Sequence, residues 1–102
     1  MSTNSTPRRS FSLGSVFATP GALEAIARSG ESPATFLGRH AQLDWGCISP
    51  SDTQLNNQAV ESGARILSAY DTQAGVRLWV ITDAADDAGD RSATTILLPQ
   101  EY

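Results

Sequence analysis

The chain contains no lysine, one cysteine and one histidine. The lone Cys47 excludes an internal disulfide, and a single thiol cannot form a metal cluster or a redox pair. No run of about eighteen apolar residues is present, so we expect no transmembrane helix and a soluble protein. Seven arginines against eleven acidic residues give a net charge of −4, which argues against nonspecific nucleic-acid binding. The net charge does not exclude a local patch of arginines that binds phosphate or carboxylate groups.

With 102 residues, the chain is long enough for one domain with its own core. Before Phe11 the residues are polar and show no apolar periodicity. We therefore expect a disordered leader over residues 1–11 and a single α+β domain over residues 12–102.

An export signal is the one targeting motif that the sequence suggests. Arg8 and Arg9 are similar to the start of a twin-arginine signal. However, the apolar run from Leu13 to Ala18 is short, and Thr19-Pro20-Gly21 interrupts it. We expect the protein to stay in the cytoplasm.

Three Ser-Pro or Thr-Pro pairs stand at the head of segments with helical spacing of apolar residues. The hydroxyl residue serves as N-cap and the proline fits the first helical position. Gly30 and Gly63 provide C-terminal stops for the first and third segments. The pattern predicts three short helices over residues 20–29, 33–41 and 50–62.

After Gly63, three segments are rich in β-branched and aromatic residues: 64–71, 76–82 and 92–98. Ala74-Gly75 marks a hairpin turn between the first two. We predict an α+β fold in which three short N-terminal helices precede a three-stranded antiparallel meander. A short extra strand at about Leu13 to Ala18 is left open.

The middle predicted strand is apolar on both faces. Its alternation places Leu78 and Val80 on one side and Trp79 and Ile81 on the other. Helices in so small a domain cover one face, so the second face needs another cover. The candidates are the N-terminal segment Phe11 to Phe17, a partner chain or a ligand.

Four aspartates crowd the segment between the last two strands, residues 83–90. A divalent-ion loop is one interpretation, but the alternating ligands and terminal Glu of a calcium loop are absent. We interpret the segment as a solvated loop and predict no metal and no cofactor.

Several motifs together carry a family resemblance: ATPGALEAI (18–26), FLGRH (36–40), DWG (44–46), RILSAY (65–70), LWVIT (78–82) and DRSATTILLPQEY (90–102). The chain resembles a family of small bacterial proteins found on plasmids and integrated elements, usually labelled plasmid-related and in some cases a type I restriction subunit. The resemblance implies an association with mobile genetic elements and no established chemistry.

If the chain is an enzyme, a small RNase-type toxin is the alternative that its residues allow. Arginines could hold phosphate, Tyr70 or the sole histidine could transfer a proton, and threonine hydroxyls could bind phosphate oxygens. Helices followed by a small antiparallel sheet is also the broad order of barnase and RelE-type toxins. The residues for this alternative are His40, Arg65, Tyr70, Arg91 and Thr94.

The hypothesis that we favour needs no catalytic group. It is a small non-enzymatic module that binds a protein partner, or a second copy of itself, through its sheet. Asp44-Trp45-Gly46 could instead be a structural corner, and Trp79 a core residue. The predicted interaction residues are Asp44, Trp45, Arg65, Tyr70, Trp79 and Arg91.

Overall fold

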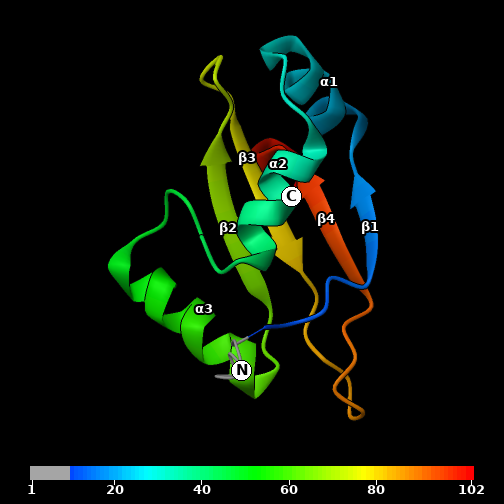
Figure 1. The fold of residues 1–102 in the computed structure, drawn as a ribbon, viewed down its shortest axis with the longest axis vertical. Helices are drawn as coiled ribbons and strands as arrows, with labels where there is room; N and C mark the ends of the chain where they lie inside the picture. Colours follow the sequence, from blue (N-terminus) through cyan, green and yellow to red (C-terminus); the bar gives the residue numbers. More distant parts are fainter. Residues whose placement is uncertain (1–9) are drawn as a thin grey trace, which may run out of the picture.

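The computed structural model describes residues 10–102, so residues 1–9 of the expected leader lie outside the described part. Figure 1 shows one layer of strands with helices against it. In chain order the elements are β1 (Ser15–Ala18), α1 (Pro20–Ser29), α2 (Pro33–Ala41), α3 (Pro50–Ser62), β2 (Ile66–Asp71), β3 (Arg77–Thr82), β4 (Ala93–Leu97) and the 3-10 helix η1 (Pro99–Glu101).

The three helices begin and end where their caps predict. Thr19, Ser32 and Ser49 each accept a backbone hydrogen bond from the first turn of the helix that follows. Gly30 and Gly63 end α1 and α3 in the left-handed conformation, with φ of 76° and 86°. The helix predictions are confirmed.

The predicted arrangement of the sheet is wrong. The sheet has four strands in the order β1-β4-β3-β2 and is mixed, because β1 pairs with β4 in parallel. Strands β2, β3 and β4 are antiparallel neighbours. Since β1 precedes α1, the helices lie within the crossover from β1 to the other strands, and not ahead of the whole sheet. Strands β1 and β4 come from the two ends of the chain. Their pairing leaves no local signal in the sequence, so the distribution of apolar residues did not predict it.

Helices α1 and α2 pack on one face of the sheet, and α3 lies beside β2 (Figure 1). Side chains from this face and from α1 and α2 form the main core, namely Ala22, Ala25, Ile26, Phe36, Tyr70, Leu78, Val80 and Ile96. A second cluster under α3 contains Trp45, Ala59 and Ile66. Phe11, at the end of the expected leader, packs against this second cluster. The N-terminal segment therefore meets the helix side, and β1 extends the sheet.

Candidate functional site

The sheet face opposite α1 and α2 is partly covered: η1 contacts β3, and the side chains of Ile81 and Leu97 on this face are 8% and 7% exposed. Among residues 10–102, no α-helix packs over this face. Strand register places the side chains of Leu67, Ile81, Thr95 and Phe17 in one row across it, and Trp79 and Leu97 in the next. We call this surface, with Arg65, Asp83 and Tyr102 at its border, the open face.

Arg65 occupies the border of the open face and holds the C-terminal residue in place. Its guanidinium donates a hydrogen bond to the Tyr102 hydroxyl and lies 5.6 Å from the centroid of that ring. The Tyr102 ring in turn meets Trp79 edge-on, with 5.6 Å between centroids. Within the described part of the chain, Arg65 has no carboxylate partner. It therefore presents a positive charge beside the Tyr102 ring, which packs in turn on Trp79.

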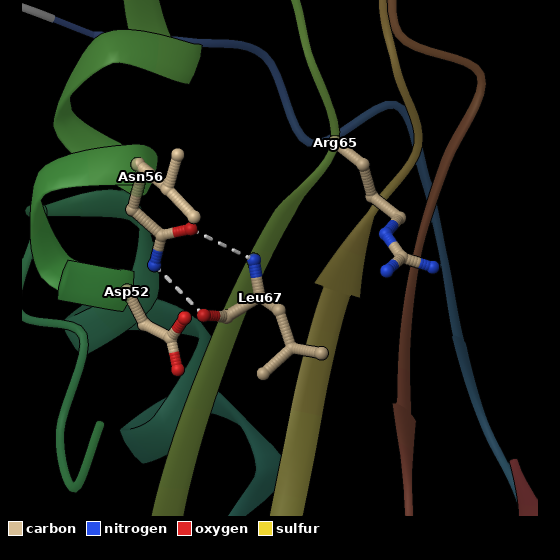
Figure 2. A pocket seen from close by; sticks show the side chains of 5 residues that line it. Asp52, Asn56, Arg65 and Leu67 are labelled. Atoms are coloured by element: carbon tan, nitrogen blue, oxygen red, sulfur yellow. Dashed lines mark hydrogen bonds between the residues drawn. The ribbon is translucent and has the colours of Figure 1, made fainter. Parts of the chain in front are cut away.

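Two depressions flank Arg65. One, of about 260 Å³, lies on the open face and includes Asp83 and Thr95 in its wall. The other, of about 210 Å³, lies between α3 and β2 (Figure 2). Large apolar side chains are exposed at both ends of this surface: Phe17 is 56% exposed and Leu55 62%. The surface is thus mixed, with exposed apolar side chains at its two ends and the charged Arg65 and Asp83 at its border.

The outer edge of β2 is blocked by α3. The Asn56 side-chain amide donates to the Leu67 carbonyl at 2.7 Å and accepts from the Leu67 N–H at 3.3 Å (Figure 2). Further along the edge, Trp45 and Cys47 exchange backbone hydrogen bonds with Ala69. Asn56 therefore imitates a neighbouring strand, and this edge of the sheet is closed to other chains.

We expect Asn56→Ala to lower the free energy of unfolding by about 1–3 kcal/mol, because it leaves both polar groups of Leu67 without their partner. Urea unfolding followed by circular dichroism measures the change. The matched control is Gln58→Ala, an exposed position on the same helix, which should change stability by less than about 0.5 kcal/mol. Equal effects of the two substitutions would contradict the strand-mimic role of Asn56.

His40 is fully buried at the centre of a hydroxyl network. Its Nδ1 lies 2.5 Å from Ser68 Oγ and its Nε2 lies 2.9 Å from Thr82 Oγ1. Thr82 Oγ1 lies 2.6 Å from Thr94 Oγ1, which donates to the Leu13 carbonyl at 2.7 Å. The network ties α2 to three strands and to the segment before β1.

The network has one consistent arrangement of protons. A carbonyl only accepts, so Thr94 donates to Leu13, and Thr82 must then donate to Thr94. Nε2 of His40 is therefore the donor to Thr82, and Nδ1 of the neutral ring accepts from Ser68. Burial, with a smaller contribution from the Arg91 charge, lowers the pKa of His40 to about 4. The ring is neutral at pH 7 and every polar atom in it is occupied.

Arg91 is also buried, at 6% exposed, and binds only backbone. Its Nη1 donates to the carbonyls of Ala64 and Asp83 at 2.8 and 3.0 Å, and its Nη2 donates to the Ala59 carbonyl at 2.9 Å. Ala59 lies in the last turn of α3, where the helix dipole favours a cation. Arg91 thus joins the end of α3 to the sheet, and its guanidinium is not free for a phosphate.

Asp44-Trp45-Gly46 forms the structural corner that the sequence offered as one interpretation. Asp44 Oδ1 accepts from the Gly46 N–H, and Gly46 has a φ of 75°. A Cβ at this glycine would collide with the backbone oxygen of Ala69. The Tyr70 hydroxyl donates to the Asp44 carbonyl at 2.6 Å, and burial raises the pKa of Tyr70 to about 12. Trp45 is 5% exposed and belongs to the core.

The six predicted interaction residues do not form one surface. Arg65 is exposed and Trp79 half-buried, and both contact Tyr102. Asp44 is exposed but lies at the corner after α2, in an ion pair with Arg39 at 2.7 Å. The remaining three are buried: Trp45, Tyr70 and Arg91.

The residues predicted for a nuclease are likewise not gathered at a point that solvent reaches. Arg65 lies at the border of the open face. His40 and Thr94 are instead linked through Thr82 in the buried layer between α2 and the sheet. His40 and Thr94 have no exposed surface, so a phosphate in solution does not reach them in this structure. The buried members of the set are His40, Tyr70, Arg91 and Thr94.

The acidic segment 83–90 consists of turns. Asp86 Oδ1 accepts from the N–H groups of Ala88 and Asp90, and Asp83 accepts from the Ser92 hydroxyl. No group of three or more His, Cys, Asp or Glu side chains in residues 10–102 is placed to hold a metal ion. Residues 83–90 thus form a loop between β3 and β4, outside the named helices and strands.

Sequence reasoning missed several members of the open face and of the buried network. Phe17 and Tyr102 were not predicted as site residues, because the face that a short strand or a chain end presents depends on the register. Ser68 and Thr82 carried a readable signal, since each alternates with large apolar residues that face the helices. A buried hydroxyl at such a position needs a hydrogen-bond partner.

Comparison of the chain with protein-family models, with curated proteins and with solved structures finds no match in any of the three. Within the part of the chain that the structure describes, no helix has the length and apolar character needed to cross a membrane. Function is therefore inferred from the geometry of the chain itself.

Proposed function

We propose that this chain is a small non-enzymatic module that binds a protein partner through the open face. The single observation that supports the proposal is the contrast between the two faces of the sheet. One face is covered by α1 and α2, and the other presents Trp79, Tyr102 and Arg65, which forms no ion pair with a described residue. Tryptophan, tyrosine and arginine are the residue types that contribute most to protein interfaces.

The chemistry of the face specifies its partner. Asp52 and Asp83 line the depressions beside Arg65, but no carboxylate within residues 10–102 forms an ion pair with it, so a partner carboxylate would give it a bidentate, charge-assisted pair. Phe17 and Leu55 would meet apolar side chains at the two ends. The partner that fits is therefore a protein surface with an Asp or Glu opposite Arg65 and apolar side chains opposite Phe17 and Leu55. From the resemblance to small plasmid-related proteins, we propose that this interaction belongs to the biology of mobile genetic elements. The free thiol of Cys47 is consistent with a cytoplasmic protein.

An RNase-type activity has no specific observation in its favour. The His40 nitrogens both bond to buried hydroxyls, and the Arg91 guanidinium is held by three carbonyls. Catalysis would require opening the core to expose the acid, the base and the phosphate ligand together.

Charge reversal at Arg65 tests the proposal. The tagged protein is purified from its native host under gentle conditions, and co-purified proteins are identified and quantified by mass spectrometry. We expect the wild type to retain a stoichiometric partner, and Arg65→Glu to retain at least tenfold less of it, because the substitution sets two carboxylates against each other.

The matched control is Arg28→Glu, an equally drastic charge reversal on α1 with a side chain 77% exposed. It should recover as much partner as the wild type. Recovery of the same partner by the Arg65→Glu protein would contradict the use of the open face. Recovery of the wild type alone, or with RNA, would contradict the binding-module proposal itself.

A further inference from the structure

We propose that a second copy of this chain pairs with strand β1, edge to edge, so that two four-stranded sheets join into one continuous sheet. This inference concerns the edge of the sheet and does not depend on a partner for the open face. It rests on the hydrogen-bonding groups, the side chains and the symmetry of Ser15–Ala18.

The outer edge of β1 carries backbone groups without partners. In the parallel ladder, the N–H groups of Ser15 and Thr19 donate to the carbonyls of Ser92 and Ile96. Alternate residues of a strand point their backbone groups in opposite directions, so Val16 and Ala18 direct theirs away from β4. No other segment of residues 10–102 lies on that side in Figure 1. The edge thus offers two donors and two acceptors.

The two edges of the sheet differ in whether other residues cover their backbone groups. The β2 edge is closed by the Asn56 amide and by the bridge at Gly46. The β1 edge has no comparable cover among the described residues, and its sequence, SVFA, contains no charge and no proline. Edge strands that stay unpaired are usually protected by a charged side chain, a proline or a covering segment. Val16 and Phe17 are instead 47% and 56% exposed on this edge.

A two-fold axis through Phe17 satisfies these groups with an identical strand. The N–H and C=O of Val16 in one copy then meet those of Ala18 in the other, which is a hydrogen-bonded antiparallel pair. The two Phe17 rings lie opposite each other as a non-hydrogen-bonded pair, the closer of the two pair types. No like charges meet across the axis, because β1 is uncharged. The arrangement also places both open faces on the same side of the joined sheet.

A second copy suits this edge better than the rest of the same chain. The nine residues before Ser10, MSTNSTPRR, contain a proline and two arginines and no β-branched aliphatic residue. Such a sequence offers little to pack against Val16 and Phe17. An identical SVFA segment provides apolar side chains on both faces and a matching set of donors and acceptors.

Sedimentation velocity on the purified full-length chain tests the pairing. We expect a dimer at tens of micromolar protein. Val16→Lys should shift it to monomer, because two ammonium groups would meet near the axis and at a half-exposed position that tolerates lysine in the folded monomer. Leu23→Lys is the control, since Leu23 is 46% exposed on α1, and it should leave the dimer intact. A monomeric wild type, or a Val16→Lys protein that stays dimeric, would overturn the proposal.

Cross-linking gives a second and independent readout. In a Cys47→Ser background, Phe17→Cys should form a disulfide-linked dimer with oxidised glutathione as the oxidant, since the two Cβ atoms face each other across the axis. Leu23→Cys in the same background should not. Equal cross-linking at both positions would reject the β1 pairing. The Arg65→Glu protein should remain dimeric, so failure of the open-face proposal and failure of this one are distinguishable.

Discussion

Replacing Arg91 with alanine is expected to lower the free energy of unfolding by about 3–4 kcal/mol, because one buried guanidinium holds three separate segments. Its carbonyl partners belong to the last turn of α3, the connection between α3 and β2, and the loop after β3. The substitution removes three charge-assisted hydrogen bonds and the contact of the guanidinium with the Phe11 ring, 5.6 Å from its centroid. It also leaves the partly buried Ala64 and Asp83 carbonyls without this donor.

Urea unfolding at pH 7 measures this loss, with Arg77→Ala as the matched control. Arg77 forms an ion pair with Asp71 at 2.6 Å, but both side chains are nearly half exposed. Exposed pairs contribute less than about 1 kcal/mol, so the control should remain close to the wild type. If Arg91→Ala costs no more than Arg77→Ala, the buried guanidinium does not hold these segments together.

Much of the local structure could be predicted from the sequence because its signals are short-range. An N-cap, a proline at the first helical position and a terminal glycine act within one or two turns of chain. Ser49, Pro50 and Gly63 therefore define α3 without reference to any other element. The hairpin at Gly75, with φ of 86°, is equally local.

The sheet order and the candidate site could not be predicted in the same way. The pairing of Ser15 with Ala93 depends on where the crossover through three helices returns, which no short window of sequence encodes. The exposure of Phe17 depends on the same pairing, because a shift of one residue would turn its ring to the helix side. Tyr102 joins the open face only because η1 turns the chain end toward Arg65 and Trp79.

The residues that the sequence offers as candidates for catalysis have structural roles in the fold. His40 and Arg91 occupy buried sites where each polar atom has a structural partner. A substrate would have to compete with those buried partners, whereas Arg65 is exposed and its partner, Tyr102, is itself a 66% exposed residue at the chain end. This difference in availability, and not residue type, is why the open face is the better candidate for function.

Acidification should destabilise the protein through His40 over a defined range of pH. The folded-state pKa of His40 is about 4, below the value of about 6.5 in an unfolded chain. Above pH 6.5 the ring is neutral in both states, and the stability of the neutral network is fully present. As the pH falls from 6.5 to 4, the unfolded state binds a proton that the folded state refuses. The free energy of unfolding should fall by about 3 kcal/mol over this range, and no further below it.

Urea unfolding at pH steps from 7.5 to 4 measures this loss, and His40→Gln separates it from other titrations. Carboxylates with lowered pKa values, such as Asp44 beside Arg39 and Asp71 beside Arg77, also cost stability in acid. They are present in both proteins, so the difference between the two pH profiles reports His40, the sole histidine. The Gln variant should be less stable at pH 7 and should have the flatter profile. Parallel profiles would mean that His40 accepts a proton within the fold, and that the neutral Nε2–H arrangement derived from Thr94 and Leu13 is incorrect.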